Sequence, residues 1–209
     1  MADAGRQIIP ASGIIGRMTA IPARKMSPRD YLAWEREQTD KHQYLGGEVF
    51  AMAGGSPRHN RLAFNVSGEL HSRLRGGNCG GFTPDQKIFI PSTGNYVYPD
   101  GGLVCGRVEL HAETRDVIEN PRVVVEVLSS STEKHDRGDK WRDYQSVSSL
   151  TDYLLVSQRL PRIEHFAREA DGSWKYRVAG PGGRIELTTG TVLDVDAIYA
   201  GTFELPSDE

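Results

Sequence analysis

The sequence predicts one α/β or α+β domain built on a mixed β-sheet, and three observations support this prediction. Two helical segments precede a β-rich middle, which ends in a strongly apolar run at residues 122–128. A helical segment and another extended segment follow that run, as in a crossover between parallel strands. The last part of the chain alternates short extended segments with glycine-containing turns, which is typical of an antiparallel meander.

Length and composition fit one globular domain. The chain has 209 residues, of which 38% are hydrophobic and 25% charged, so it is not a disordered chain. No run of about 18 apolar residues occurs, so no membrane span is expected. Pro10 and Ser12 break the apolar run near the N-terminus, which therefore lacks a secretory pattern. We expect a cytoplasmic protein with a flexible tail over residues 1–25 and a single domain over residues 26–205.

Charge and cysteine content narrow the function classes. The formal net charge of −3 argues against a broadly basic surface that coats DNA. This net charge does not exclude a nuclease. Metal-binding carboxylates lower the net charge, and a local basic groove cannot be recognised from the total charge of the chain. Cys79 and Cys105 match no zinc motif. Two thiols in a chain of this length do not suggest a disulfide scaffold, so we expect both to be reduced.

The first part of the chain predicts two helices separated by a hairpin. Ser27 can cap a helix that begins at Pro28 and extends to about Gln38. Residues 44–52 predict a hairpin that turns at two adjacent glycines. Pro57 lies at the start of a second helix, in which apolar residues recur at every fourth position until two glycines end it. Those apolar residues are Leu62, Val66, Leu70 and Leu74.

The rest of the chain predicts strands with one helix among them. Residues 122–128 contain four valines and a leucine, which indicates a central strand buried on both faces. A helix is predicted over residues 136–147. The other expected strands are residues 87–90, 96–105 and 153–156, followed by a meander of residues 163–166, 174–178 and 184–187.

Glu126 is the most informative residue, because it lies within the buried strand. A carboxylate there is costly unless it is paired or binds a metal. Asp100 follows Pro99 in the preceding extended segment and supplies a second carboxylate. Carboxylates on adjacent strands can hold Mg or Mn, which would polarise a phosphodiester and lower the pKa of a bound water. The alternative is an edge strand in which Glu126 reaches solvent.

A positive group is expected beside the scissile phosphate. Leu128 has the same strand parity as Glu126, so a lysine at that position would point at the site. The nearest substitute is Lys140 on the following helix. Asp136, at i−4, could orient this lysine or simply pair with it. The alternative for Lys140 is an ordinary solvated helix face.

Several other polar positions also have two interpretations. His59 lies near a helix start, where it is either an ordinary polar residue or a helper near the metal or phosphate. Residues 129–132 either contact phosphate or cap the next helix. Asp85 also follows a proline, but we interpret it as a turn residue just before a strand. Trp141 and Tyr144 are expected to pack against the core rather than to stack on bases.

Four runs of sequence together resemble the Uma family of bacterial proteins (the "Uma-two" group), which belongs to the PD-(D/E)XK restriction-endonuclease-like superfamily. The resemblance covers residues 26–203 and implies a central mixed β-sheet flanked by helices, with a C-terminal antiparallel meander. The runs are Tyr-Pro-Asp, Val-Glu-Val-Leu-Ser-Ser-Ser-Thr, Asp-Arg-Gly-Asp-Lys-Trp-Arg-Asp-Tyr and Ser-Leu-Thr-Asp-Tyr-Leu-Leu-Val.

The resemblance also implies roles for particular residues. It puts the Pro-Asp motif at Asp100 and the (D/E)XK motif at Glu126-Val127-Leu128, with the lysine moved to Lys140. It implies metal contacts from Asp100, Glu126 and Val127.

The early glutamate of the superfamily maps onto Glu48, which would complete the metal shell or position the lysine. Similar sequences often have glutamate where this chain has Gln43, and the identity of that upstream acid is therefore open.

These observations favour a metal-dependent DNA endonuclease. One alternative is a nucleic-acid-binding or structural protein that keeps the nuclease fold with little activity. Another is a hydrolase of a different phosphoester that uses the same metal site. A homodimer is expected from the resemblance alone.

Overall fold

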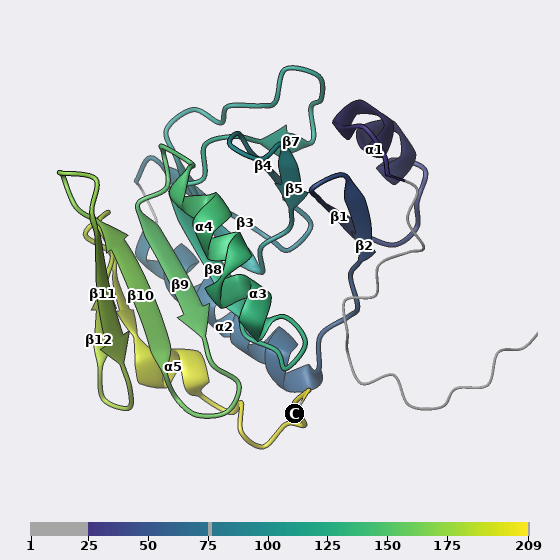
Figure 1. Ribbon diagram of the computed structural model, residues 1–209. Helices are drawn as coiled ribbons and strands as arrows, with labels where there is room; N and C mark the ends of the chain where they lie inside the picture. The colour runs from purple at the N-terminus through teal and green to yellow at the C-terminus, as the bar shows by residue number, and fades with distance from the viewer. Residues whose placement is uncertain (1–24, 75–76, 209) are drawn as a thin grey trace, which may run out of the picture.

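A six-stranded mixed sheet forms the centre of the molecule (Figure 1). The computed structural model describes residues 25–74 and 77–208. β8 pairs parallel with β9 and antiparallel with β6, so the sheet is mixed, as the sequence predicted. In spatial order its strands are β11 (Trp174–Ala179), β10 (Ile163–Arg168), β9 (Asp152–Val156), β8 (Val123–Val127), β6 (Gly101–Cys105) and β3 (Cys79–Phe82).

A second sheet of five strands packs against the first through a shared hydrophobic cluster. Helix α1 (Pro28–Glu35) covers its other face. The strands of the second sheet are β2 (Glu48–Ala51), β1 (His42–Leu45), β5 (Asn95–Val97), β4 (Lys87–Ile90) and β7 (Val117–Ile118). A separate two-stranded sheet joins β12 (Arg184–Glu186) to β13 (Val192–Asp194).

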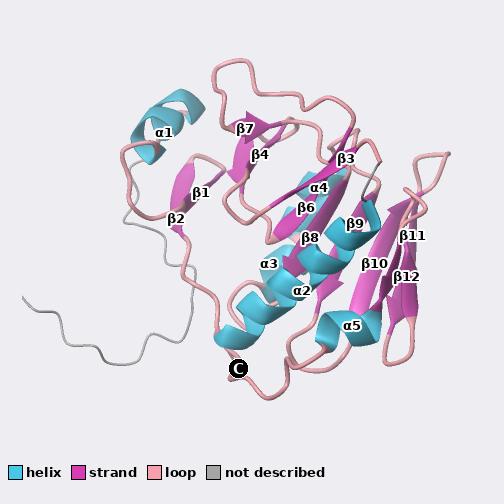
Figure 2. Cartoon of the chain, turned by 180° about the vertical axis from the view of Figure 1, so that it is seen from behind, coloured by secondary structure: helices cyan, strands magenta, loops and turns pink. Residues whose placement is uncertain are grey.

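Helices cover both faces of the central sheet (Figures 1 and 2). One face packs against α2 (Pro57–Leu74) and α5 (Val195–Tyr199), whereas α3 (Glu133–Arg137) and α4 (Asp139–Gln145) lie on the other. Within the described ranges no helix has the length and apolar character needed to cross a membrane.

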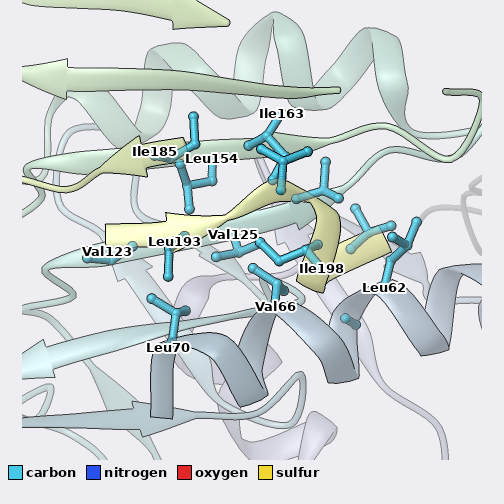
Figure 3. Packing of buried hydrophobic residues seen from close by; sticks show 14 of the residues in the cluster. Leu62, Val66, Leu70, Val123, Val125, Leu154, Ile163, Ile185, Leu193 and Ile198 are labelled. Carbon is cyan, nitrogen blue, oxygen red and sulfur yellow. The ribbon is translucent and has the colours of Figure 1, made fainter. Parts of the chain in front are cut away.

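Side-chain alternation along β8 decides which residues face the site. Val123, Val125 and Val127 pack into the cluster formed with α2 and α5 (Figure 3). Val124 and Leu128 pack on the opposite face, in the cluster that contains residues of α4. Because successive side chains of a strand point to opposite faces, Glu126 shares the face of Val124 and Leu128.

Local signals in the first part of the chain give the expected elements. The Ser27 hydroxyl accepts a hydrogen bond from the Asp30 amide at 3.2 Å and caps α1. Gly46 and Gly47 both have positive φ and form the turn between β1 and β2. Three residues of the apolar stripe predicted in α2, Leu62, Val66 and Leu70, are buried. The tail expected over residues 1–25 lies outside the described residues except for Lys25.

The single extended segment predicted over residues 96–105 is wrong, because the chain changes sheets there. It leaves the five-stranded sheet after Val97 and enters the central sheet at Gly101. Pro99 has no amide hydrogen to donate to a ladder, and Asp100 uses its side chain to bond the strand beside it. This crossover places Asp100 at the end of β6.

The helix predicted over residues 136–147 is also wrong, because it forms two shorter helices that meet at Gly138. Gly138 has φ −112° and ψ −97°, which lies outside the helical region. The predicted meander likewise holds only for β10 and β11. Its third strand, β12, pairs with β13 instead and packs Ile185 against the core of the α2 face.

Cys79 and Cys105 form a disulfide, where the sequence led us to expect two reduced thiols. The two residues lie directly opposite each other in the antiparallel pair of β3 and β6. Their pairing depends on the register of two strands that are distant in sequence. Residue spacing alone does not reveal this register, which accounts for the incorrect expectation.

Candidate active site

Asp100 and Glu126 lie opposite each other on neighbouring strands of the central sheet. β6 and β8 run antiparallel with Gly101 opposite Val125, so Asp100 and Glu126 are the next pair along this register. The Asp100 amide donates to the Val125 carbonyl at 3.1 Å and extends the ladder to this pair. Directly opposed residues point to the same face of a sheet. The register therefore brings the two residues side by side at one end of the sheet, where Glu126 is contacted from α4 and Asp100 from α2.

Lys140 reaches Glu126 from helix α4. Its Nζ lies 2.7 Å from Oε1 of Glu126 and 3.5 Å from Oδ1 of Asp136. Tyr144, one helical turn further on, donates to the same Glu126 oxygen at 3.1 Å. The Lys140 and Glu126 side chains are each only 4% exposed, and β8 is an interior strand of its sheet. The structure thus excludes both a solvated lysine and an edge-strand glutamate.

Negative charge is in excess in this cluster. Burial raises the pKa of Glu126 well above its usual value, and the charges of Asp136 and Asp100 raise it further, although Lys140 opposes them. Burial also raises the pKa of Asp136, again against the effect of Lys140. An additional positive charge would stabilise the carboxylate form of both acids.

Lys140 has the properties of a permanent cation. Burial alone would lower the pKa of Lys140, but the charges of Glu126 and Asp136 raise it above the value of an ordinary lysine. Lys140 is therefore an ammonium group at neutral pH. It can donate hydrogen bonds and stabilise negative charge, but it has no lone pair with which to accept a proton from water.

His59 approaches Asp100 from the first turn of α2. Its Nε2 lies 3.4 Å from Oδ2 of Asp100, and the same oxygen accepts a hydrogen bond from the Val127 amide at 2.7 Å. Burial alone would raise the pKa of Asp100, but the hydrogen bond and charge of His59 lower it. His59 thus lies at the site rather than at an unrelated helix start.

One oxygen each of Asp100 and Glu126 could serve as a ligand to a hard divalent cation. Oδ1 of Asp100 and Oε2 of Glu126 accept no hydrogen bond from any described residue, so one oxygen of each carboxylate is uncommitted. Across the described ranges no group of three or more His, Cys, Asp or Glu side chains could together hold a metal. Mg²⁺ does not require three, because it keeps several waters and often binds through one or two carboxylates.

Glu48 is not brought into the cluster. It lies at the start of β2 and is only partly buried, and no hydrogen bond or ion pair within the described ranges joins it to Asp100, Glu126 or Lys140. Gln43 is buried in β1, and its Oε1 has no partner among the described residues. Asp85 pairs with Lys41 on the surface, as expected of a turn residue.

A groove runs beside α3 and α4, next to the buried cluster. It is lined by Phe50 of the hairpin and by side chains of both charges, the cationic Lys134 and Arg142 and the acidic Asp139 and Asp143. His135 also lines it, and the Nε2 of this residue has no hydrogen-bond partner among the described residues. The groove therefore has a mixed polar and aromatic lining beside α4, the helix that carries Lys140.

Sequence reasoning missed the contributions of Tyr144 and Gln158. Tyr144 was interpreted as packing, yet its hydroxyl bonds Glu126. Its position four residues after Lys140 was the available signal, since i and i+4 share a helix face. Gln158 donates to the Leu128 carbonyl at 2.8 Å, and nothing in its sequence neighbourhood indicated that contact.

The fold and the sequence both place the chain in the PD-(D/E)XK restriction-endonuclease-like class. The family model described as "Uma2: Putative restriction endonuclease" matches residues 28–197. The chain belongs to this Uma2 family.

Solved and curated relatives agree with this assignment. A crystal structure from Anabaena variabilis, titled as "a putative nuclease belonging to DUF820", aligns with a TM-score of 0.69 over 85% of this chain and 99% of that one, at 10% identity. Two uncharacterized proteins of Synechocystis sp. are similar in sequence. One, slr1290, is 38% identical over 90% of this chain and 98% of its own length. The other, sll1609, is 29% identical over 75% and 89%.

Proposed function

We propose that this protein is a metal-dependent endonuclease that hydrolyses phosphodiester bonds of DNA. The observation that carries the proposal is the cluster of Asp100, Glu126 and Lys140, in which the Lys140 ammonium lies 2.7 Å from a carboxylate of an interior strand. Membership in the family whose model is described as "Putative restriction endonuclease" supports the same reaction class.

The free carboxylate oxygens of Asp100 and Glu126, with the backbone carbonyl of Val127, would hold Mg or Mn. Such an ion, when bound, supplies Lewis-acid stabilisation of the phosphate and lowers the pKa of a coordinated water. Each of these residues already has a fixed position. Asp100 is held by the Val127 amide at 2.7 Å, and Glu126 by Tyr144 and Lys140.

Lys140 would orient the attacking water and stabilise the charge that develops on the phosphoryl oxygens. It cannot be the general base, because its charged partners keep it protonated. Asp136 lies 3.5 Å from the Lys140 Nζ and would limit the rotation of that side chain. His59 would help to hold Asp100 in the position that the metal requires.

Metal-dependent cleavage of DNA tests the proposal. Supercoiled plasmid and labelled single- and double-stranded DNA are incubated with Mg or Mn, using wild type, Asp100→Ala and Glu126→Ala. We expect cleavage by wild type alone and its loss in EDTA. Calorimetric titration of Mn into Glu126→Gln tests the ligand assignment separately and should show weakened binding.

A catalytically weak nucleic-acid-binding protein is the second candidate. The ion pair of 2.7 Å between Lys140 and Glu126 favours it, because the carboxylate that would hold the metal already has a cationic partner. Tight DNA binding without cleavage in either metal would support this alternative and contradict the first.

A further inference from the structure

The C-terminal segment lies against the start of α2, beside the candidate active site. Figure 1 marks this end of the chain next to α2. Arg58 holds the segment, since its amide donates to the Pro206 carbonyl at 3.1 Å and its Nε to the Leu205 carbonyl at 3.0 Å. The Arg58 guanidinium also lies 5.0 Å from the ring centre of Phe203.

In this position of the C-terminal segment, the carboxylate of Asp208 contacts the buried side-chain amide of Gln158. Nε2 of Gln158 donates to Oδ2 of Asp208 at 3.1 Å, and the Ser130 hydroxyl donates to the Asp208 backbone carbonyl at 3.0 Å. Gln158 is only 1% exposed. The Ser56 hydroxyl donates to Oε1 of Gln158 at 3.0 Å, so the amide is oriented with its NH₂ group toward Asp208.

Bonded residues connect this amide to the acid cluster. The Ser56 hydroxyl accepts from the His59 amide at 3.1 Å, and the His59 ring lies 3.4 Å from Asp100. Gln158 also donates to the carbonyl of Leu128, two residues after Glu126 in β8. Burial alone would lower the pKa of His59, but the hydrogen bond and charge of Asp100 raise it, and the charge of Asp208 adds to that rise.

We propose that the Gln158 amide, the Ser130 hydroxyl and the Arg58 backbone amide, which now donate to Asp208 and Pro206, form a subsite for a phosphate group of the nucleic-acid strand, and that the C-terminal segment occupies it in the free protein. The identity of the ligand rests on the proposed function. A carboxylate and a phosphate are both anionic acceptors, and amide, hydroxyl and helix N-terminal donors suit either. The protein's own carboxylate then competes with the strand for these donors.

Removing the competing charge should strengthen DNA binding. The affinity of a fluorescein-labelled DNA oligonucleotide is measured by fluorescence anisotropy in EDTA, so that cleavage does not interfere. Asp208→Asn and a chain that ends at Leu205 should both bind at least about fivefold more tightly than wild type. Glu37→Gln is the matched control, because Glu37 is exposed just after α1 and its substitution removes the same charge.

The gain should require the Gln158 amide. Gln158→Ala should weaken DNA binding. In the Gln158→Ala background, Asp208→Asn should raise the affinity for DNA by less than half of the increase that it produces in wild type. Ser130→Ala gives the same comparison at a more exposed position, in case Gln158→Ala does not fold. An Asp208→Asn affinity no higher than that of Glu37→Gln, or an undiminished gain in the Gln158→Ala background, would overturn the proposal.

Inorganic phosphate separates this proposal from the proposed function. Calorimetric titration of phosphate should give tighter binding to Asp208→Asn than to wild type, and the difference should vanish with Gln158→Ala. This result stands even if no DNA is cut or bound, in which case the nuclease assignment alone fails. Phosphate binding that is equal in all three proteins would refute the subsite itself.

Discussion

At the scale of single residues, the state of Lys140 decides what the cluster can do. It is a buried ammonium whose nearest partners, Glu126 and Asp136, are both acidic. Its contribution to a reaction is therefore a fixed positive charge, which is most valuable where negative charge develops on a phosphate.

Lys140→Met should abolish most of the activity while leaving DNA binding nearly intact. Loss of one stabilising charge at the reacting group costs about two to three orders of magnitude in rate. Lys175→Met is the matched control, because that lysine is exposed on the edge strand β11 and should change the cleavage rate little. Cleavage rates at saturating DNA, with melting temperatures of both variants, make the comparison. Equal losses in the two variants would argue against a catalytic role for Lys140.

A buried hydrogen-bonded pair of Asp152 and His165 lies away from the site and supports the fold. Asp152 accepts hydrogen bonds from Nε2 of His165 at 2.8 Å and from the Thr188 amide at 2.9 Å. Both the Asp152 and His165 side chains are completely buried. Burial alone would raise the pKa of Asp152, but the hydrogen bonds from His165 and Thr188 lower it below its usual value.

The stabilisation from Asp152 should depend on pH. A lowered folded-state pKa means that the stabilisation is complete above the unfolded value of about 3.9 and is lost as the pH falls through the folded value. Asp152→Asn should cost about 1.5–3 kcal/mol of unfolding free energy at pH 7, because it replaces the charged acceptor of these buried hydrogen bonds with a neutral one. The gap to wild type should narrow toward pH 3 in urea titrations followed by circular dichroism. A gap that stays constant between these pH values would contradict this explanation.

At the scale of elements, the break between α3 and α4 sets the position of Lys140. A methyl group on Gly138 would lie 2.9 Å from the Lys134 carbonyl oxygen, so the helices would have to shift to accept a side chain. Asp136 lies before the break and Lys140 after it. The geometry of their ion pair therefore depends on the backbone at Gly138.

Gly138→Ala should lower both stability and activity. Forcing a methyl group against a backbone oxygen is expected to cost about 1–3 kcal/mol, and the shift of α4 should displace Lys140 from Glu126. Gly68→Ala in the exposed part of α2 is the control. Its methyl group would meet nothing within 4 Å, so it should stabilise the protein by about 0.5–1 kcal/mol. Thermal unfolding and cleavage assays on both variants provide the measurement, and a fully active Gly138→Ala would refute the argument.

Local patterns predicted those elements whose signals lie within a few residues. The Ser27 cap, the glycine turn of the hairpin and the valine run around Glu126 each indicated the structure that forms. Elements that depend on distant partners were not predictable in this way. The change of sheet after Val97 and the separate β12–β13 pair follow from which strand lies alongside, and that information is not local.

The candidate site was predictable to a similar extent. The valine run marked Glu126 as a carboxylate in a buried strand, and the resemblance to the Uma family directed attention to Lys140. Neither could show that the Tyr144 hydroxyl would bond Glu126, or that Asp208 would reach Gln158 from the end of the chain. These contacts arise only when segments that are remote in sequence pack together.

At the scale of the whole molecule, the two main sheets share one core. Ile88, Ile90 and Val97 of the five-stranded sheet pack in the same cluster as Val124 and Leu155 of the central sheet. The backbone joins the sheets directly at the crossover that carries Asp100. Neither sheet can lose its structure without exposing apolar surface of the other, so the described domain should unfold as one cooperative unit.

Tryptophan fluorescence can test this cooperativity, because the three tryptophans report on different sides of the molecule. Trp34 packs on the α1 side, with its ring 4.7 Å from that of His42. Trp141 stacks on Tyr153 at 5.2 Å, and Trp174 packs beside it on the α4 side.

A Trp34→Phe variant and a Trp141→Phe/Trp174→Phe variant each leave one side visible. Within each variant, the urea midpoint from fluorescence should coincide with that from circular dichroism, because the shared cluster couples both sheets. Comparing the two signals within one variant removes any effect of the substitutions on overall stability. If the Trp34 signal changed at a lower urea concentration than the circular dichroism, the five-stranded sheet would be a separate folding unit, and Asp100 would then lie at a junction between two independently stable parts.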